Sequence, residues 1–548
     1  MDVRIPVALA SVVLHCTVLS AQTPSLDVAA WRVDLRMLAT ELPARHPAPF
    51  AKITRAEWDS AVVRLDRSLP KLGRDQIIVE LFRLVASVGD AHTNIQPNPS
   101  LGLRYYPLEL YSFEDGLFVR SADSVHANLV GGKVLRIGRV SADEALTTAG
   151  AIIPHENEWW VRAWAPFWLM VPEMIHGLGI ASDPERLRLV VERGGRVDSL
   201  VITPAGQFRD GHSGGPIDEG GWMTMRRTAA PLWEQHPDQL FWWTYLPASR
   251  SLYVCSRAVV PVPGAATNRA QWDSIFALAD STSASRLVLD IRENQGGNGF
   301  LNRYPIQQIL RRPTLDRPDR LFMIIGRRTF SAGQQFANLF EAWTHGTLVG
   351  EPTGQQPSQY GDHKPLELPH SHLIVSISTI FHQAPNEFDR RSFVPPVIYA
   401  PLTSEEYAQG VDPALAAVLA ADTIPSPISV VERAVLTGDT LGAETALRVA
   451  QGLVANRFHG LEAEVNALGY RLLGTGKVEP AIFAFQVNTR VYPRSANTYD
   501  SLGEALAAAG RRAEAIGAYR KALELDPSFG SSQEALRRLG AAPARPPQ

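Results

Sequence analysis

The sequence predicts an α/β core, preceded by a helical segment and a β-rich segment and followed by an array of helical repeats. Two short apolar runs in the middle of the chain, residues 287–291 and 321–325, have the length of strands buried on both faces of a sheet. Apolar residues at helical spacing follow the second run. Near the C-terminal end, small residues and prolines recur at a constant offset of 34 positions. These observations predict alternating strands and helices in the core and stacked helix pairs behind it.

The length and composition of the chain describe a multidomain globular protein. At 548 residues the chain is too long for one hydrophobic core. Apolar residues make up 45% and charged residues 20%, which is ordinary for a globular protein. A net charge of −3 gives no reason to expect nucleic acid or acidic lipid as a partner. The function must therefore be sought in local motifs.

Residues 1–21 have the pattern of a signal peptide. Arg4 supplies a positive charge, residues 5–19 form the apolar run, and Leu19-Ser20-Ala21 forms a small-residue cleavage site. The apolar run is short for a membrane span. We therefore expect export to the periplasm or the extracellular space, cleavage after Ala21, and no transmembrane segment afterwards.

The two cysteines do not predict a disulfide. Cys16 lies in the expected signal peptide, and His15 precedes it where a lipoprotein signal would have a small residue. Cleavage would leave Cys255 as the only thiol, in an apolar run. We expect Cys255 to be buried and chemically inert.

Residues 27–98 are predicted to form a helical region. Its last helix has a buried stripe at a spacing of three and four residues, formed by Ile78, Leu81, Phe82, Val85 and Val88. Gly89 ends this helix, and Asp90-Ala91-His92-Thr93 follows at a corner that leads into a strand. A single histidine is more often structural than catalytic.

Residues 100–204 are predicted to be rich in strands, with a turn at Glu114-Asp115-Gly116. The sequence from Gly131 to Ile137, with the helical pattern behind it, resembles the carboxylate-binding loop and strand of a PDZ-like module. Such a module would hold a chain end by β-augmentation. The alternative is a β-rich insertion that only covers the functional site of the protein.

Residues 205–225 are predicted to be a glycine-rich linker, although they contain a G-x-S-x-G match at Ser213. A nucleophile elbow needs a strand before the serine and a helix after it. Gly214, Gly215 and Pro216 do not permit that helix. Ser213 is therefore not expected to be catalytic.

Residues 230–422 are predicted to form the core that carries the chemistry. The strand at 287–291 runs into a loop that contains Gly296 and Gly297, whose N–H groups a ligand can approach closely. The strand at 321–325 leads to Ser331 at the start of a helix, where unpaired N–H groups favour negative charge. Ser331 is either a nucleophile or an ordinary N-cap.

Three motifs in this region resemble those of the tail-specific, or C-terminal-processing, serine proteases, including the tricorn core and interphotoreceptor retinoid-binding protein. They are Asp290-Ile291-Arg292-Glu293-Asn294-Gln295-Gly296-Gly297, then Phe330-Ser331-Ala332-Gly333, then Val349-Gly350-Glu351-Pro352-Thr353-Gly354. The resemblance implies a crotonase-like ββα core and Ser331 as nucleophile. It also implies an oxyanion hole formed by the N–H group of Ala332 and that of Gly296 or Gly297.

The same resemblance leaves two bases to compare, a lysine after the third motif or a histidine as in the tricorn branch. Gln355 stands where the lysine would be, and Lys364 is displaced. His92 lies in a corner similar to the D-G-H-T corner of tricorn-like members, so we expect His92 to be the base. If His92 is the base, kcat/KM should show an ionisation at roughly pH 6–7.5, below which activity falls.

The group that orients His92 stays open at the level of sequence. Ala91 occupies the place of a serine that helps to orient the histidine in tricorn. Asp90, Glu387 and Asp389 are the candidate carboxylates, because an imidazole base needs an acceptor on its second nitrogen.

No metal site or cofactor is expected. The chain has no H-E-x-x-H motif, and His363, His370 and His372 lie in a polar stretch without paired carboxylates at ligand spacing. A solvated loop is the expected setting of these histidines.

Residues 429–540 are predicted to form tetratricopeptide repeats, after a linker at residues 424–427. Leu468, Gly476 and Pro493 recur 34 positions later, as Leu502, Gly510 and Pro527. The clear repeats fall near residues 466–499 and 500–533, and residues 429–458 supply a degenerate third.

The sequence therefore predicts an exported, metal-independent serine peptidase that acts on unstructured or C-terminal peptide segments. Its expected partners are a peptide or protein substrate and a protein bound by the repeats. Two alternatives remain open, a non-catalytic binding protein on the same core and a scaffold whose function lies in the repeats. The substrate and the oligomeric state are not predicted.

Overall fold

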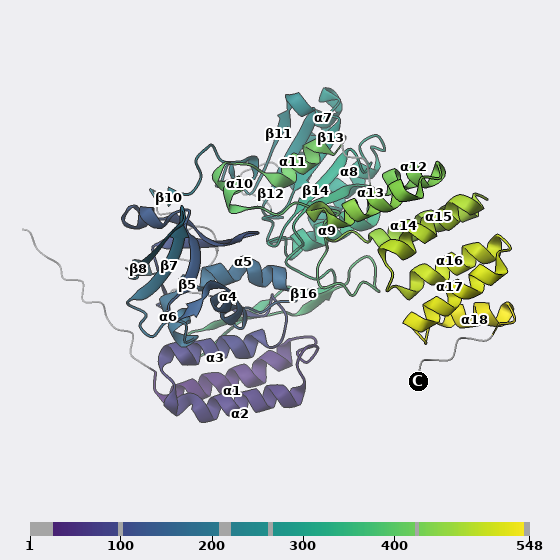
Figure 1. Ribbon diagram of the computed structural model, residues 1–548. Coiled ribbons are helices and arrows are strands. Elements are labelled where there is room, and N and C mark those ends of the chain that lie inside the picture. Colours follow the sequence, from purple (N-terminus) through teal and green to yellow (C-terminus); the bar gives the residue numbers. More distant parts are fainter. Residues whose placement is uncertain (1–25, 97–101, 208–220, 261–266, 422–426, 542–548) are drawn as a thin grey trace, which may run out of the picture.

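The computed structural model of the protein describes residues 26–96, 102–207, 221–260, 267–421 and 427–541 (Figure 1). The expected signal peptide, Cys16 and Ser213 lie outside the described residues. Among the described residues, no helix combines the length and the apolarity that crossing a membrane would require.

Three helices form the N-terminal region, as the apolar spacing predicted. They are α1 (Val28–Arg45), α2 (Arg55–Ser68) and α3 (Arg74–Ala86). The predicted stripe of α3 is buried, with Val85 fully covered. Gly89 has a φ of 71°, and this left-handed turn directs the chain into the corner that contains His92 and then into β1 (Asn94–Gln96).

A twisted sheet with three helices follows. Its strands are β3 (Leu108–Phe113), β4 (Gly116–Ala122), β5 (Lys133–Ile137), β6 (Val140–Ser141), β7 (Leu187–Arg193), β8 (Arg196–Ile202) and β10 (Met223–Thr224). The helices are α4 (Ala142–Gly150), α5 (Glu158–Trp168) and α6 (Pro172–Gly177), and β2 (Arg104–Tyr105) pairs with β9 (Gly206–Gln207).

The loop that resembles a PDZ carboxylate cradle is already hydrogen-bonded within the fold. The Gly131 N–H donates to the carbonyl of Val119 at 2.9 Å, and the Gly132 N–H donates to the carbonyl of Leu129 at 2.9 Å. These two groups are therefore not available to a chain-end carboxylate, and the PDZ-like assignment stays a prediction.

The core is a six-stranded sheet in the order β11-β12-β13-β14-β15-β20. Its strands are β11 (Phe241–Leu246), β12 (Ser251–Ser256), β13 (Arg286–Asp290), β14 (Leu321–Ile325), β15 (Thr347–Gly350) and β20 (Ile398–Tyr399). All neighbours are parallel except β11 and β12. Every residue of β13 and β14 is buried, which confirms the two strands predicted from their apolar runs.

Helices cover both faces of this sheet (Figure 1). One face packs against α7 (Asn268–Thr282), α8 (Arg303–Leu310) and α9 (Ala332–Trp343). The other face packs against α11 (Pro413–Ala420), which follows the short α10 (Ser404–Ala408). Cys255 on β12 is buried, and burial raises the pKa of its thiol to about 12, in agreement with the inert role predicted for it.

A buried ion-pair cluster joins the first of the three sequence motifs to the end of the core. Arg292 donates from Nε to Asp290 at 3.0 Å and from its two terminal nitrogens to Asp412 at 2.9 and 2.8 Å. Tyr253 donates to the other oxygen of Asp290 at 2.6 Å. The D-x-R part of the motif is therefore structural, because its arginine neutralises two buried carboxylates.

A long hairpin connects the core to the N-terminal helices. It pairs β16 (Gln359–Gly361) with β19 (Ile380–His382) and β17 (Lys364–Glu367) with β18 (Ile374–Ile377), and β18 also pairs with β1. At its tip, the buried carboxylate of Asp34 in α1 accepts the N–H groups of His370 at 3.0 Å and Ser371 at 2.7 Å.

The C-terminal part consists of stacked helix pairs, as the repeat predicted. They are α12 (Pro427–Leu436) with α13 (Thr440–Gly452), α14 (Leu461–Gly474) with α15 (Val478–Val491), and α16 (Ala496–Ala508) with α17 (Arg512–Leu525), followed by α18 (Gly530–Arg538). A Cβ at Gly469 would lie 2.5 Å from the Phe485 ring, and one at Gly503 would lie 2.8 Å from the Tyr519 ring. The repeated glycines therefore allow paired helices to approach.

Phe458 and Arg457 dock the repeat array on α5 and the core, and Arg457 lies 3.6 Å from Glu114 and over the Tyr399 ring. The ring of Phe458 lies 5.9 Å from that of Trp159, 6.0 Å from that of Phe393 and 5.0 Å from that of Tyr399. Beyond these contacts, the array extends away from the core toward the C-terminus (Figure 1).

Candidate active site

Ser331 lies between β14 and α9 in a strained backbone conformation. Its φ is 54° and its ψ is −121°, a combination that L-residues adopt only when the surrounding structure enforces it. Its side chain makes no capping hydrogen bond to α9, which contradicts the N-cap alternative. The turn matches the strand-to-helix geometry that presents a nucleophilic hydroxyl.

Two N–H groups beside Ser331 are open. In the described part of the chain, the N–H groups of Ala332 and Gly297 have no hydrogen-bond acceptor, whereas that of Gly296 donates to Asn294 Oδ1 at 3.0 Å. Gly296 is instead needed for space, because a Cβ there would lie 2.5 Å from Ser331 Cβ. The geometry thus favours Ala332 and Gly297 as the oxyanion-hole pair.

His92 lines the same cleft as Ser331. Its ring stacks on Phe330 with 4.3 Å between centroids, and Phe330 stacks on Trp160 at 4.2 Å. Burial lowers the pKa of His92 to about 4, against the opposing effect of the Asp90 charge. His92 is therefore neutral at pH 7, and burial corrects the prediction of an ionisation at roughly pH 6–7.5, because it places that ionisation lower.

Asp90 organises the corner around His92 without contacting its ring. One oxygen accepts the His92 backbone N–H at 3.1 Å. The other accepts the hydroxyls of Thr93 and Ser378, both at 2.6 Å, and lies 3.1 Å from His46 Nε2. Of the three candidate orienters, Asp90 alone is brought to the His92 corner.

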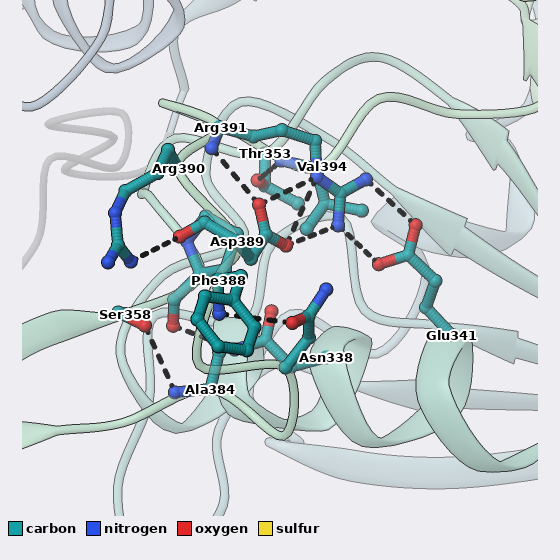
Figure 2. A network of polar contacts seen from close by, with 12 residues as sticks. Asn338, Glu341, Thr353, Ser358, Ala384, Phe388, Asp389, Arg390, Arg391 and Val394 are labelled. Atoms are coloured by element: carbon teal, nitrogen blue, oxygen red, sulfur yellow. Dashed lines mark hydrogen bonds and ion pairs between the residues drawn. The ribbon is translucent and has the colours of Figure 1, made fainter.

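The carboxylate of Asp389 belongs to a loop network (Figure 2), in which Glu387 takes part through its backbone carbonyl, which accepts from Arg390 at 2.7 Å. Asp389 forms an ion pair with Arg391 at 2.7 Å, and Arg391 also binds Glu341 at 2.7 Å. Among the described contacts, neither Asp389 nor Glu387 forms a hydrogen bond or ion pair with His92. The structure does not bring these two residues to the imidazole.

Gln355, which the sequence analysis noted only as the residue in the lysine position, connects Ser331 to His92. Its Oε1 accepts the Ser331 backbone N–H at 2.7 Å, and its Nε2 lies 3.0 Å from His92 Nδ1. Gln359 adds a second link, donating to the Ser331 carbonyl at 3.0 Å. Lys364 is exposed on β17. The sequence held one signal for the role of Gln355, which is that it stands where the resemblance would place a lysine.

Glu156 is a further residue of the site that the sequence did not indicate. Its Oε1 lies 3.4 Å from both the Ala91 N–H and Gln355 Nε2. Burial raises the pKa of Glu156 to about 8, and the nearby charge of Asp90 adds to this effect. The carboxyl group is therefore largely protonated at pH 7.

The cleft has a volume of about 1350 Å³, with Ser331 and His92 on its wall. The exposed aromatic side chains Phe300 and Trp343 contribute an apolar part of its lining. His363, which was expected in a solvated loop, is exposed but lies at this cleft, with its ring centroid 6.4 Å from that of His92. No group of three metal-ligating side chains occurs in the part of the chain that the structure describes.

Comparison with known proteins adds to this geometry. A family model described as a tetratricopeptide repeat matches residues 496–529. Mature CPAF is similar in structure, with a TM-score of 0.51 and 12% identity over 72% of this chain and 99% of that chain. Mature CPAF complexed with lactacystin has a TM-score of 0.50 with the same identity and coverage. The photosystem II D1 C-terminal processing protease has a TM-score of 0.31 and 13% identity over 70% of this chain and 98% of that chain.

The predicted family resemblance is confirmed as a likeness of fold, which the two CPAF structures carry. A search of curated proteins gave no match. The tetratricopeptide repeat is confirmed, although its frame starts at Ala496, the first residue of α16, rather than near residue 500.

Proposed function

We propose that the protein is an exported serine peptidase that hydrolyses peptide bonds in unstructured or C-terminal segments, with Ser331 as nucleophile and His92 as base. The observation that carries this proposal is the strained Ser331 turn, whose hydroxyl makes no capping bond and whose neighbouring N–H groups are open. The shared fold with CPAF supports it. We also propose that the core is crotonase-like.

The reaction follows from these positions. Ser331 Oγ attacks the carbonyl carbon of the scissile bond, and its proton passes to the unprotonated nitrogen of His92. The carbonyl oxygen takes the electron pair and is stabilised by the N–H groups of Ala332 and Gly297. The C–N bond breaks as the imidazolium gives its proton to the leaving amine. Water, activated by the same imidazole, then hydrolyses the acyl-enzyme ester.

Replacing the nucleophile tests the proposal. Ser331→Ala should lower kcat on a panel of unstructured peptides by about 10³-fold or more, because no other group can form the ester. The substitution should leave the Tm nearly unchanged, since the Ser331 side chain makes no cap. Ser213→Ala, at the other serine with a catalytic-type motif, is the matched control and should keep full activity. Equal hydrolysis by wild type and Ser331→Ala would exclude Ser331 as nucleophile.

His92 should give a separate signature in the pH dependence. Because burial lowers the pKa of His92 to about 4, the acid limb of kcat/KM that reports its protonation should lie in that region. His92→Gln should remove this acid limb and most of the turnover, whereas Lys364→Ala should change neither. A loss of activity in Lys364→Ala with a silent His92→Gln would refute the histidine mechanism.

One observation favours the second candidate, a non-catalytic binding protein on the same fold. Gln355 occupies His92 Nδ1 and the Ser331 N–H at the same time, so the base is engaged in this structure. If purified protein binds peptides in the cleft but Ser331 reacts with no peptide or fluorophosphonate at any pH, this candidate replaces the peptidase.

The repeat array is proposed to bind a protein partner or a substrate segment, as stacked helix pairs commonly do. Truncation before α12 should spare cleavage of short peptides and weaken cleavage of a large substrate. Unfolding of the truncated core would instead support a structural role for the array.

A further inference from the structure

Glu156 lies behind Gln355 and has no part in the steps above. It precedes α5, and its Oε1 lies within 3.4 Å of Gln355 Nε2. Its second oxygen, Oε2, is buried and has no hydrogen-bond partner among the described residues. Leaving a buried polar atom unpaired costs free energy, so such an atom calls for an explanation.

The contacts of Gln355 decide how its amide is oriented. Oε1 accepts the Ser331 N–H at 2.7 Å, so Nε2 is the end that faces His92 and Glu156. An amide nitrogen is a donor, and it lies 3.0 Å from His92 Nδ1. His92 is therefore the tautomer that carries its proton on Nε2. In this tautomer Nδ1 is the unprotonated nitrogen of the ring, and Gln355 occupies it.

We propose that Glu156 is a positioning residue of the peptidase site: its carboxylate draws the Gln355 amide away from His92 Nδ1 and frees that nitrogen to accept the Ser331 proton. This inference rests on the proposed function. The amide nitrogen has two hydrogens and already contacts both acceptors, at 3.0 Å from His92 Nδ1 and 3.4 Å from Glu156 Oε1, so only a small rotation is needed to lengthen the first contact and shorten the second. Oε1 can stay on the Ser331 N–H throughout.

The protonation state of Glu156 determines how strongly it draws the amide nitrogen away from His92 Nδ1. A carboxylate accepts a hydrogen bond from an amide more strongly than a neutral carboxyl group does. Burial and the charge of Asp90 raise the pKa of Glu156 to about 8, so the carboxylate forms as pH rises through that value. The charged and titratable groups around it are Asp90, His92 across Gln355, and His46, which contacts Asp90. The transfer should therefore favour catalysis above about pH 8.

The pH dependence of kcat/KM between pH 6 and 10 is the first test. Wild-type protein should show an increase of about tenfold centred near pH 8, since a charge-assisted hydrogen bond replaces a neutral one. Glu156→Gln, which cannot ionise, should lack the increase. Glu158→Gln is the matched control, because Glu158 belongs to the same segment but is exposed. An increase that persists in Glu156→Gln would overturn the inference.

A second measurement does not depend on activity. The Cε1–H resonance of His92, identified by its loss in His92→Gln, should shift with an inflection near pH 8 in wild type and not in Glu156→Gln. Active wild-type enzyme without this inflection overturns the role of Glu156 and leaves the peptidase intact. If the inflection is present but neither wild type nor any variant hydrolyses peptides, the peptidase proposal is overturned instead.

If Glu156→Gln does not fold, Gln355→Met gives the same test. Without the amide group, Glu156 has nothing to draw away from His92. An increase in kcat/KM near pH 8 that persists in Gln355→Met would overturn the inference.

Discussion

The repeat array and the region around the candidate active site use contacts of different range. In the array, a glycine and an aromatic ring on neighbouring helices meet at Gly469 and Phe485, and the same pair returns at Gly503 and Tyr519. In the core, the contact between Gln355 and His92 joins residues 263 positions apart. The array is thus specified by a local rule that repeats, whereas the site exists only after distant segments have come together.

Buried charge should show the largest difference between the two regions. Arg292→Ala leaves the carboxylates of Asp290 and Asp412 buried without their partner, and we expect the free energy of unfolding to fall by about 3–5 kcal/mol. In the array, Arg471 pairs with Glu432 where both side chains are partly exposed, so Arg471→Ala should cost only about 0–1 kcal/mol. Urea unfolding of both variants measures the difference. Similar losses would show that the core cluster is not the stronger constraint.

Glycine substitutions sharpen the same comparison. Gly296→Ala places a Cβ 2.5 Å from Ser331 Cβ, so it should displace the nucleophile and lower kcat/KM by about 10²-fold or more. Gly510→Ala, in a left-handed turn between α16 and α17 with no atom near the new Cβ, should leave kcat/KM unchanged and cost about 1 kcal/mol of stability. Peptide assays with thermal unfolding separate the two effects. Full activity in Gly296→Ala would contradict the proposed packing around Ser331.

The smallest expected effect concerns the junction of the two regions. Phe458 is partly exposed, so Phe458→Ala should cost roughly 1–2 kcal/mol, less than the loss at a fully buried phenylalanine. The informative readout is cooperativity in calorimetry: the array and the core should unfold together in wild type and separately in Phe458→Ala. Leu441→Ala, an exposed apolar side chain of the array, is the control. Two transitions already present in wild type would show that Phe458 does not couple the regions.

Sequence patterns predicted the elements whose determinants are local. The helix period predicted the buried face of α3, the apolar runs predicted β13 and β14, and the 34-residue offset predicted the repeat helices. The motif resemblance indicated Ser331 because a strand, a sharp turn and a helix are close in sequence. Local patterns of this kind can be recognised without knowing which distant residues pack against them.

The rest of the site could not be predicted because it depends on burial and on distant contacts. No pattern around Glu156 shows that Gln355, 199 positions away, lies beside it. The lowered pKa of His92 comes from burial, which a sequence does not display. The choice between Gly296 and Gly297 depended on which N–H group Asn294 uses.

The hairpin that joins the core to α1 has a consequence for the order in which the protein is made. During synthesis, the segment with Asp90 and His92 emerges long before the segment with Ser378, whose hydroxyl binds Asp90 at 2.6 Å, and before β18, which pairs with β1. Domains tend to fold as they leave the ribosome, N-terminal parts first. The His92 corner must nevertheless wait until residue 382 has emerged and the hairpin has closed. A nascent chain shorter than this should lack a formed cleft around Ser331 and His92.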